Sequence, residues 1–444
     1  MANPSVYSTN AKAQDSALYL ANHRGGDFSV ASVTTTTVVL DDASPLTGIA
    51  LYATATPGML VIKESADGAA NHGLTTEITG ITSNTLTVAD DFATATELAD
   101  GDIVTVIPPL AVQISTNGGH SISETRSYDE SMGLSDTSLT HITPLGTSVG
   151  GDISVFATVD SMSFARLLLA GTGGYNKSAT GVHDYIPFQY DDGTYAEFND
   201  FTIYAKDGNG IVNRAFYGMF GTQLTINVPS NAVCTASLST LGNGVVREVG
   251  GAGKTFDSGN NKWIEDSIPC DNADRFSSIG ALFELGGSFG DAITDSRDKF
   301  LQNVTVTISR EGQEDPVLGN QFNTKADEGS HMVIITGTRI LENDTYYENS
   351  YGTTTSADPE LPTATRALLV LTTPSSASRT LTVDVPRGIF TAAPVQRQRG
   401  KFTQDFTFTG LQTLDGDDCP DTANPLYRMR FNNGIDTDLG TALY

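Results

Sequence analysis

The sequence is poor in cysteine, tryptophan and basic side chains. Its 444 residues include three cysteines and one tryptophan. Cys234, Cys270 and Cys419 lie far apart and form no Cys-x-x-Cys pair, which argues against a thiolate zinc site. An odd number of scattered cysteines favours free, buried thiols in a reducing compartment.

Long hydrophobic runs are also missing. No stretch approaches the roughly 18 apolar residues that a membrane span requires. The first twenty residues lack the basic start and apolar run that are typical of a signal peptide. We therefore expect a protein that is made and kept in the cytoplasm and has no membrane partner.

Charged residues make up only 17% of the chain, and most of them are acidic. The 25 basic and 52 acidic side chains give a formal net charge of −27. Such a chain is repelled at long range by phosphate backbones, which argues against tight nucleic-acid binding. The acidity is equally well explained as a device that keeps the protein soluble.

Threonine, serine, glycine, asparagine and aspartate are abundant, while 39% of residues are hydrophobic. β-Branched residues fit a pleated sheet, and Gly, Asn and Asp fit turns. We expect a mainly β fold of two or three domains. Residues 1–27 are predicted to form a polar N-terminal arm, residues 28–110 a small all-β domain, and residues 111–444 a larger β domain.

The small domain is predicted from short apolar runs separated by turn signals. The turn signals are Pro57-Gly58, Ser83-Asn84 and Asp100-Gly101. Within the domain, residues 85–88 alternate between threonine and an apolar side chain, which indicates a half-buried strand.

The larger domain contains one clear helical pattern, in the sequence DSMSFARLLLAG. Phe164, Leu167 and Leu168 fall on one face at helical spacing. Asp160 or Ser161 is expected to cap the start of the helix, and Gly171 to end it in a left-handed conformation.

Alternating strands occupy much of the rest of this domain. Asp207-Gly208-Asn209-Gly210 predicts a hairpin turn. Apolar residues alternate with polar ones at Leu224–Val228, Val304–Ile308 and Leu381–Val385. Residues 230–275 are rich in Gly and Asn and are predicted to form a long surface insertion.

Motifs that carry chemistry in other proteins have the wrong context here. Ser148 lies in a Gly-x-Ser-x-Gly match, but a strand and not a helix is expected to follow it. Gly250–Thr255 is similar to a phosphate-binding loop, but Glu248 replaces its first glycine. The six histidines are scattered, and Asp415–Asp418 lacks the ligand spacing of an EF-hand. We predict no catalytic, cofactor or metal site, and no enzyme activity.

One basic run stands out in this acidic chain. It comprises Arg387, Arg397, Arg399 and Lys401. Neighbouring copies of the chain would offer many acidic partners, so intersubunit ion pairs are one interpretation. A plain solvated face is the other main one, and contact with nucleic acid is the third.

Four segments together resemble the tail tube (major tail) proteins of bacteriophages. They are VGGDISVFATVDSMSFARLLLAGTGG at 149–174, the hairpin and strand series from FTIYAKDGNG at 201–244, the strand, loop and strand at 300–344, and LTVDVPRGIFTAAPVQRQRGKFTQDFTFTGLQT at 381–413. They follow the order expected of that family and cover most of residues 118–414. Residues 28–110 resemble the inserted β domain of some members, whereas residues 230–275 depart from shorter members.

The resemblance implies a β-sandwich or barrel-like core with one flanking helix. It also implies a structural protein of the virion, in which rings of six copies stack into a hollow tube that DNA passes through without specific binding. The implied partners are further copies of the chain, the tape measure, the tail terminator, and the baseplate or tail tip. The ring-stacking contact is expected on a polar loop at about Tyr128–Thr147, which includes Tyr128, Asp129, Glu130 and Asp136.

We also expect the acidic excess to line the tube and to repel DNA phosphates. Three other interpretations stay open. One is another virion structural protein, such as a decoration or head–tail connector subunit. The others are a β-sandwich carbohydrate-binding module and a hydrolase that uses Ser148.

Overall fold

The structure is a computed structural model, and it describes residues 17–21, 27–34, 36–41, 58–64, 75–82, 84–88, 98–107, 112–114, 116–131, 141–159, 162–187, 196–197, 201–207, 212–247, 274–293, 298–314, 326–343, 345–351, 364–374, 379–398, 400–412 and 425–434. These residues form strands β1 to β25 and two α-helices, with antiparallel pairing throughout the registers. The mainly β class predicted from the composition is therefore confirmed.

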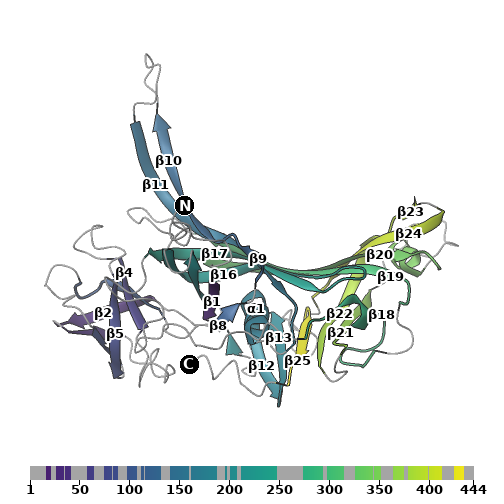
Figure 1. Ribbon diagram of the computed structural model, residues 1–444, viewed down its shortest axis with the longest axis horizontal. Coiled ribbons are helices and arrows are strands. Elements are labelled where there is room, and N and C mark those ends of the chain that lie inside the picture. The colour runs from purple at the N-terminus through teal and green to yellow at the C-terminus, as the bar shows by residue number, and fades with distance from the viewer. Residues whose placement is uncertain are drawn as a thin grey trace, which may run out of the picture.

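A small closed barrel lies at one end of the molecule (Figure 1). Its strands, in barrel order, are β2 (Asp27–Val33), β3 (Thr37–Leu40), β6 (Thr85–Val88), β5 (Thr75–Thr82), β4 (Gly58–Glu64) and β7 (Ile103–Ile107). The barrel has its own buried core, which includes Leu60, Leu86 and Val104. The alternation predicted for residues 85–88 is present, because Leu86 and Val88 are buried between the threonines.

The barrel is inserted into a hairpin of the larger domain. β1 (Ala17–Ala21) precedes it and β8 (Val112–Ile114) follows it, and these two strands pair antiparallel, with Leu20 opposite Val112. β1 also pairs with β15 (Phe201–Asp207). The predicted arm is therefore wrong for residues 17–21, which form a strand of the large sheet.

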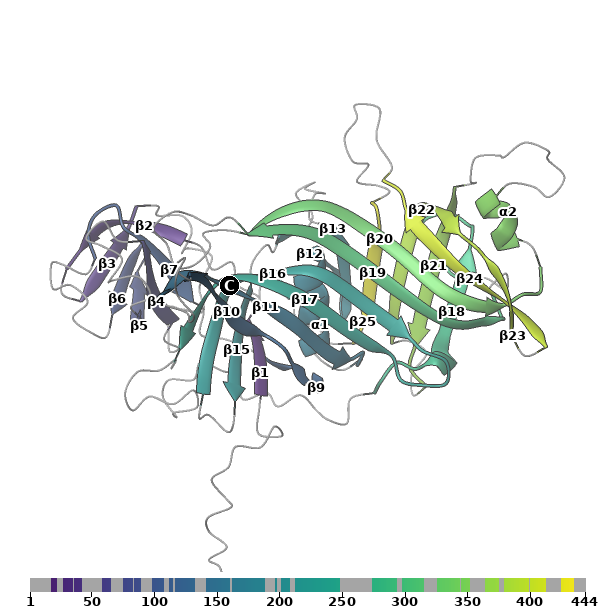
Figure 2. The ribbon, with the colours of Figure 1, turned by 90° about the horizontal axis from the view of Figure 1, so that it is seen from above.

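The larger domain has two layers. The first layer runs in the order β11 (His141–Phe156), β17 (Thr235–Arg247), β16 (Val212–Val228), β19 (Leu301–Glu314), β20 (Ala326–Ile340) and β24 (Lys401–Gly410). β9 (Thr116–His120) and β10 (Ser123–Ser131) pair with β11, and β23 (Val395–Gln398) pairs with β24. Figure 2 looks down on this layer.

The second layer runs in the order β14 (Ala196–Glu197), β12 (Gly173–Ala179), β13 (Val182–Pro187), β25 (Arg428–Asn432), β22 (Thr380–Ala392), β21 (Thr365–Thr372) and β18 (Ala281–Leu285). A 3-10 turn, η5 (Ser278–Gly280), precedes β18. β22 joins the layers, because its first half pairs with β21 and β25 and its second half with β24.

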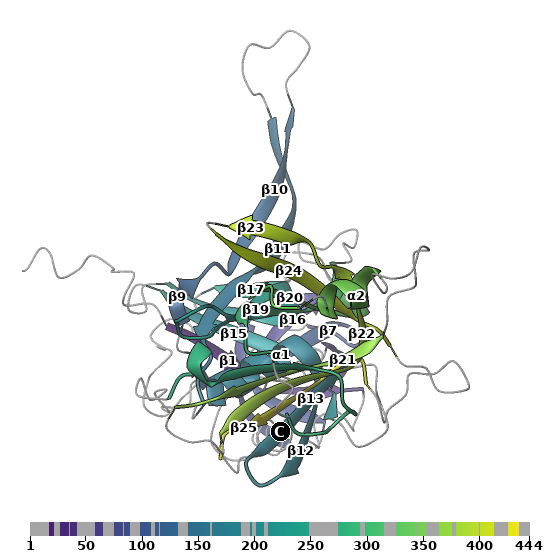
Figure 3. The same ribbon diagram turned by 90° about the vertical axis from the view of Figure 1, so that its right-hand side faces the viewer.

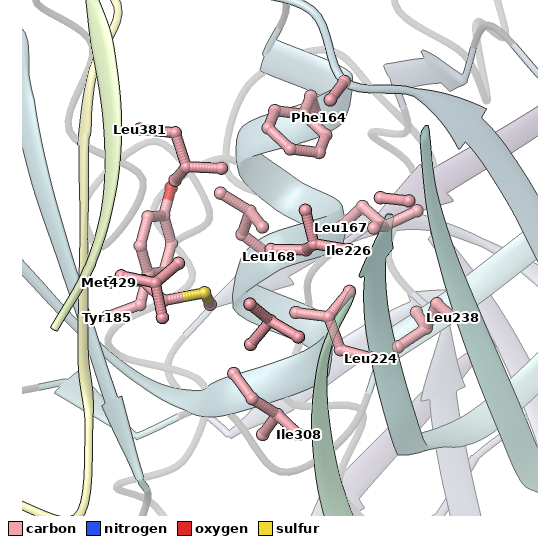
Figure 4. Close-up of a cluster of buried hydrophobic side chains, with 14 of the residues drawn as sticks. Phe164, Leu167, Leu168, Tyr185, Leu224, Ile226, Leu238, Ile308, Leu381 and Met429 are labelled. Atoms are coloured by element: carbon pink, nitrogen blue, oxygen red, sulfur yellow. The ribbon is translucent and has the colours of Figure 1, made fainter. Parts of the chain in front are cut away.

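Helix α1 (Met162–Thr172) lies between the two layers (Figures 3 and 4). Its buried side chains meet side chains from both layers in one core. Figure 4 labels Phe164, Leu167 and Leu168 of the helix, Leu224, Ile226, Leu238 and Ile308 of the first layer, and Tyr185, Leu381 and Met429 of the second. The helix predicted from spacing is confirmed, while its two candidate caps lie outside the described residues. A second, short helix, α2 (Thr345–Tyr351), packs near β22.

Two local predictions are wrong. Gly171 does not end α1 in a left-handed conformation, because the helix runs on to Thr172 and the positive φ of 85° belongs to Gly173. Residues 230–275 are not one surface insertion, because β17 lies between β11 and β16 in the middle of the first layer. Residues 248–273 lie outside the described part.

Candidate assembly interface

The outward side of the first layer carries mostly threonine and serine side chains. Val304, Val306 and Ile308 of β19 point into the core, so the residues between them point outward. The pairing registers align the outward residues in rows across the strands, and we call this surface the hydroxyl face. Its rows are Asp152, Ser239, Gln223, Ser309 and Met332; Ser154, Ser237, Thr225, Thr307, Ile334 and Thr409; Phe156, Thr235, Asn227, Thr305, Thr336 and Thr407; and Asn303, Thr338 and Asp405.

Hydrogen bonds tie the polar groups of the hydroxyl face to one another. Ser239 Oγ donates to Asp152 at 2.6 Å, and Thr338 Oγ1 donates to Asp405 at 2.7 Å. None of the residues in the rows is buried. The charged groups within the rows are the two carboxylates, and the Arg275 guanidinium lies over the Phe156 ring, 4.1 Å from its centroid. The face is therefore solvent-accessible and mostly polar, with Phe156, Met332 and Ile334 as its apolar members.

The β10–β11 hairpin extends away from the first layer (Figures 1 and 3). Its strands pair from Ser123 opposite Gly150 to Ser131 opposite His141, with a register shift after Ser127. Among the described residues, β10 pairs with β11 and β1 pairs with β15 and β8, so the other edge of β10 is open. An open edge of this kind can accept a strand from another chain.

The predicted ring-stacking loop is shorter than expected. The segment Tyr128–Thr147 was predicted as a loop, but β10 continues to Ser131 and β11 begins at His141. The backbones of Asp129 and Glu130 lie opposite Thr143 and Ile142. Tyr128 is 48% exposed. Asp136 lies outside the described residues.

A second exposed hairpin, β23–β24, lies at the opposite end of the first layer (Figures 1 and 2). Arg397 is opposite Phe402 and Val395 is opposite Gln404, so these side chains share one face. The same face of β24 carries the core residues Phe406 and Phe408. This face extends beyond the core along both strands of the hairpin. Phe402 of β24 is therefore 53% exposed, and Val395 of β23 is 43% exposed.

The predicted basic run is split by the fold. Arg387 of β22 lies beside Leu411, whose amide donates to its carbonyl oxygen at 2.8 Å. Arg397 and Lys401 lie at the other end of β24, and at about 3.3 Å per residue the two sites are about 30 Å apart. All three side chains are exposed, and the described residues include no acidic partner within ion-pair distance of them. Arg399 lies outside the described residues.

Some of the motifs for which no chemistry was predicted lie in the described part of the chain, and others lie outside it. Ser148 lies inside β11 opposite Thr125, and not at a strand-to-helix turn. His183 is fully buried, where Nδ1 meets Tyr175 Oη at 2.8 Å and Nε2 meets Asn433 Oδ1 at 3.1 Å. Gly250–Thr255 and Asp415–Asp418 lie outside the described residues. In the part that is described, no group of three or more His, Cys, Asp or Glu could hold a metal ion.

Sequence reasoning missed the hydroxyl face as a surface. The signal was present, since Thr305 and Thr307 alternate with buried valines and Thr225 and Asn227 alternate with Leu and Ile. Which strands lie side by side was not visible, because β16 and β19 are separated by more than 70 residues.

A comparison with models of known protein families and with curated proteins finds no match for this sequence. No described helix is both long enough and apolar enough to cross a lipid bilayer.

Proposed function

We propose that the chain is the structural subunit of a phage tail tube, in which rings of six copies stack into a hollow conduit for DNA. Two kinds of argument support the proposal. One is the family resemblance of the four sequence segments. The other is the combination of a broad polar sheet with two exposed hairpins at its opposite ends.

The hydroxyl face is the observation that carries the proposal. A wall along which DNA moves must not hold phosphates, and lysine and arginine are the groups that hold them. The rows of this face offer mainly hydroxyl groups and two carboxylates instead, and one cation, Arg275, lies over the Phe156 ring at their β11 end. We therefore assign the hydroxyl face to the lumen, where Asp152 and Asp405 would repel phosphates.

The two hairpins supply the assembly contacts in this proposal. Different surfaces at opposite ends of a subunit make heterologous contacts, which generate rings where the rotation closes and filaments where it does not. Arg397 and Lys401 of β23–β24 would pair with acidic groups of an adjacent copy, and Val395 and Phe402 would be covered there. The β10–β11 hairpin would reach the next ring. The terminator, the tape measure and the baseplate or tail tip are the further partners that such a tube needs.

Electron microscopy of the purified chain tests the proposal directly. Long hollow tubes are the expected result. Closed rings that never stack would favour the second candidate, a head–tail connector or decoration subunit. A chain that stays monomeric at high concentration would refute both.

A pair of lysine substitutions tests the lumen assignment. Thr225→Lys with Thr307→Lys places two cations on the hydroxyl face, and Ser178→Lys with Ala179→Lys places two on the exposed end of β12 as a matched control. Tubes of the first variant should retain DNA in their interior in a salt-dependent manner, since phosphate binding weakens with salt. Equal DNA binding by both variants would contradict the assignment.

Shortening the β10–β11 hairpin tests the stacking contact. Deletion of Ser131–Asp136 should leave a folded subunit that forms no tubes, because the strands up to Glu130 keep their pairing. Circular dichroism checks the fold and sedimentation checks the assembly. Tubes of normal length from this variant would exclude the hairpin as the stacking element.

A further inference from the structure

A depression of about 470 Å³ lies between the loop that follows β18 and the start of β21. It is lined by Gly286–Phe289, Ala364–Arg366, Pro386 and Arg387. Its polar side chains are those of Ser288, Thr365, Arg366 and Arg387, and no Asp or Glu is among its lining residues.

Arg366 lines the depression and is held rigidly by hydrogen bonds. Its Nε and Nη2 bind Asp384 at 2.7 and 2.8 Å, and Nη2 also donates to the carbonyl oxygen of Asp291 at 2.9 Å. The third nitrogen, Nη1, has no hydrogen-bond partner among the described residues and lies beside Gly287. The residue is only 4% exposed, and it is one of the residues that line the depression.

The glycine loop is fixed against Arg366 by its own amides. Gly286 N donates to the Arg366 carbonyl oxygen at 2.9 Å, Ser288 N to Asp291 Oδ2 at 2.9 Å, and Gly290 N to Asp384 Oδ2 at 3.1 Å. Gly286 and Gly287 have φ values of 92° and 80°, which only glycine adopts without strain. The wall of the depression is therefore preorganised.

Two carboxylates border the depression, those of Asp384 and Asp291, and Asp291 Oδ2 accepts a hydrogen bond from the Ser288 amide at 2.9 Å. Asp384 is neutralised by Arg366, and Arg428 lies 4.0 Å from it. Arg387 also lines the depression, and its exposed side chain has no acidic partner among the described residues. Two arginines thus line one space, and guanidinium groups suit the oxygens of an oxyanion.

We infer that the depression at Arg366 and Arg387 is a binding site for an oxyanion, a carboxylate or a phosphate group. Arg387 supplies the exposed charge and Arg366 Nη1 the fixed donor, while Ser288 and Thr365 supply hydroxyl donors. The anion comes either from solution or from an acidic side chain of a second copy. The inference does not depend on the proposed function, because a single subunit contains the whole site.

Calorimetric titration of the full chain with inorganic phosphate tests the site, at a protein concentration where the chain is monomeric and at constant ionic strength. The wild type should bind saturably. Arg387→Gln should weaken binding about tenfold or more, the effect expected for the loss of a charged hydrogen-bond donor. Ala364→Glu should weaken it equally, because a resident carboxylate would occupy the site. Arg397→Gln, the same change at an exposed arginine about 30 Å away, should have no effect.

Two results would overturn the inference. One is the absence of saturable phosphate binding by the wild type. The other is equal weakening by Arg387→Gln and Arg397→Gln, which would indicate a general charge effect. If the wild type binds phosphate, sedimentation with and without saturating phosphate separates the two sources. Loss of self-association identifies a carboxylate of a second copy, and unchanged self-association identifies a free anion.

Discussion

At the scale of residues, two arginine–aspartate pairs share a geometry but differ in exposure. Arg366–Asp384 and Arg430–Asp184 are both bidentate, with distances of 2.7 and 2.8 Å. The Arg366 side chain is 3% exposed, whereas that of Arg430 is 42% exposed. Loss of the carboxylate therefore leaves Arg366 charged in the interior, while Arg430 can turn to water.

This difference predicts unequal losses of stability. Asp384→Asn should lower the free energy of unfolding by about 3–5 kcal/mol, the cost of an uncompensated buried charge. Asp184→Asn should lower it by about 1 kcal/mol or less, because an exposed partner is resolvated. Urea denaturation of both variants gives the comparison. Similar losses in the two would show that burial of the arginine is not the deciding factor.

A buried thiol predicts a pH dependence of stability. Burial raises the pKa of Cys234 to about 12, against about 8.5 for an exposed thiol. The unfolded chain therefore loses this proton first, so the stabilisation is complete below about pH 8.5 and falls as pH rises from there towards 12. Between pH 7 and pH 10 the wild type should lose about 2 kcal/mol more than Cys234→Ala. Denaturant titrations at several pH values give the comparison. The same pH dependence of the free energy of unfolding in the wild type and in Cys234→Ala would contradict the prediction.

At the scale of elements, the packing of α1 against the first layer leaves no space at Gly171. A Cβ added there would lie 2.7 Å from Leu224 Cβ. Helix propensity alone predicts that Gly171→Ala is stabilising by about 1 kcal/mol. The contact predicts the opposite, a loss of about 1–3 kcal/mol from overpacking. Gly171→Ala combined with Leu224→Ala should recover part of that loss, and a gain in stability from Gly171→Ala alone would exclude the close contact.

The elements that the sequence predicted well are those whose pattern is local. α1 was predicted because Phe164, Leu167 and Leu168 need only helical spacing to share a face. β17 was missed, because Gly242 and Gly244 are typical of turns. These glycines are needed for tertiary packing. A Cβ added at Gly242 would lie 2.2 Å from Met219 Sδ, and one added at Gly244 would lie 2.3 Å from Tyr217 Oη. The glycines give space to side chains of β16, and no pattern within β17 reveals that.

The candidate assembly residues, too, could be predicted only where the signal is local in the sequence. Exposed basic residues were visible in the sequence, but their separation along β24 was not, because Arg387 belongs to a different strand from Arg397 and Lys401. The depression at Arg366 was also invisible, because it joins residues 286–289, 364–366 and 386–387 through the pairing of β18, β21 and β22.

At the scale of the whole molecule, the two β units differ in their edges. The small barrel is closed, so each of its strands has partners on both sides. In the larger domain, β10 pairs with β11 alone and β23 with β24 alone among the described strands. We therefore expect strand addition and self-association to occur through the larger domain, because the closed barrel offers no open strand edge.

The insertion point of the barrel makes this separation testable. Leu20 already pairs with Val112, so residues 21–111 can be replaced by Asn-Gly, a dipeptide suited to a two-residue hairpin turn. The shortened chain should fold, because β1 and β8 keep their register, and should self-associate as the full chain does. Sedimentation and electron microscopy of both chains give the comparison. A folded but strictly monomeric product would show that the barrel supplies an assembly contact, and the closed sheet would then act through its side chains instead of its edges.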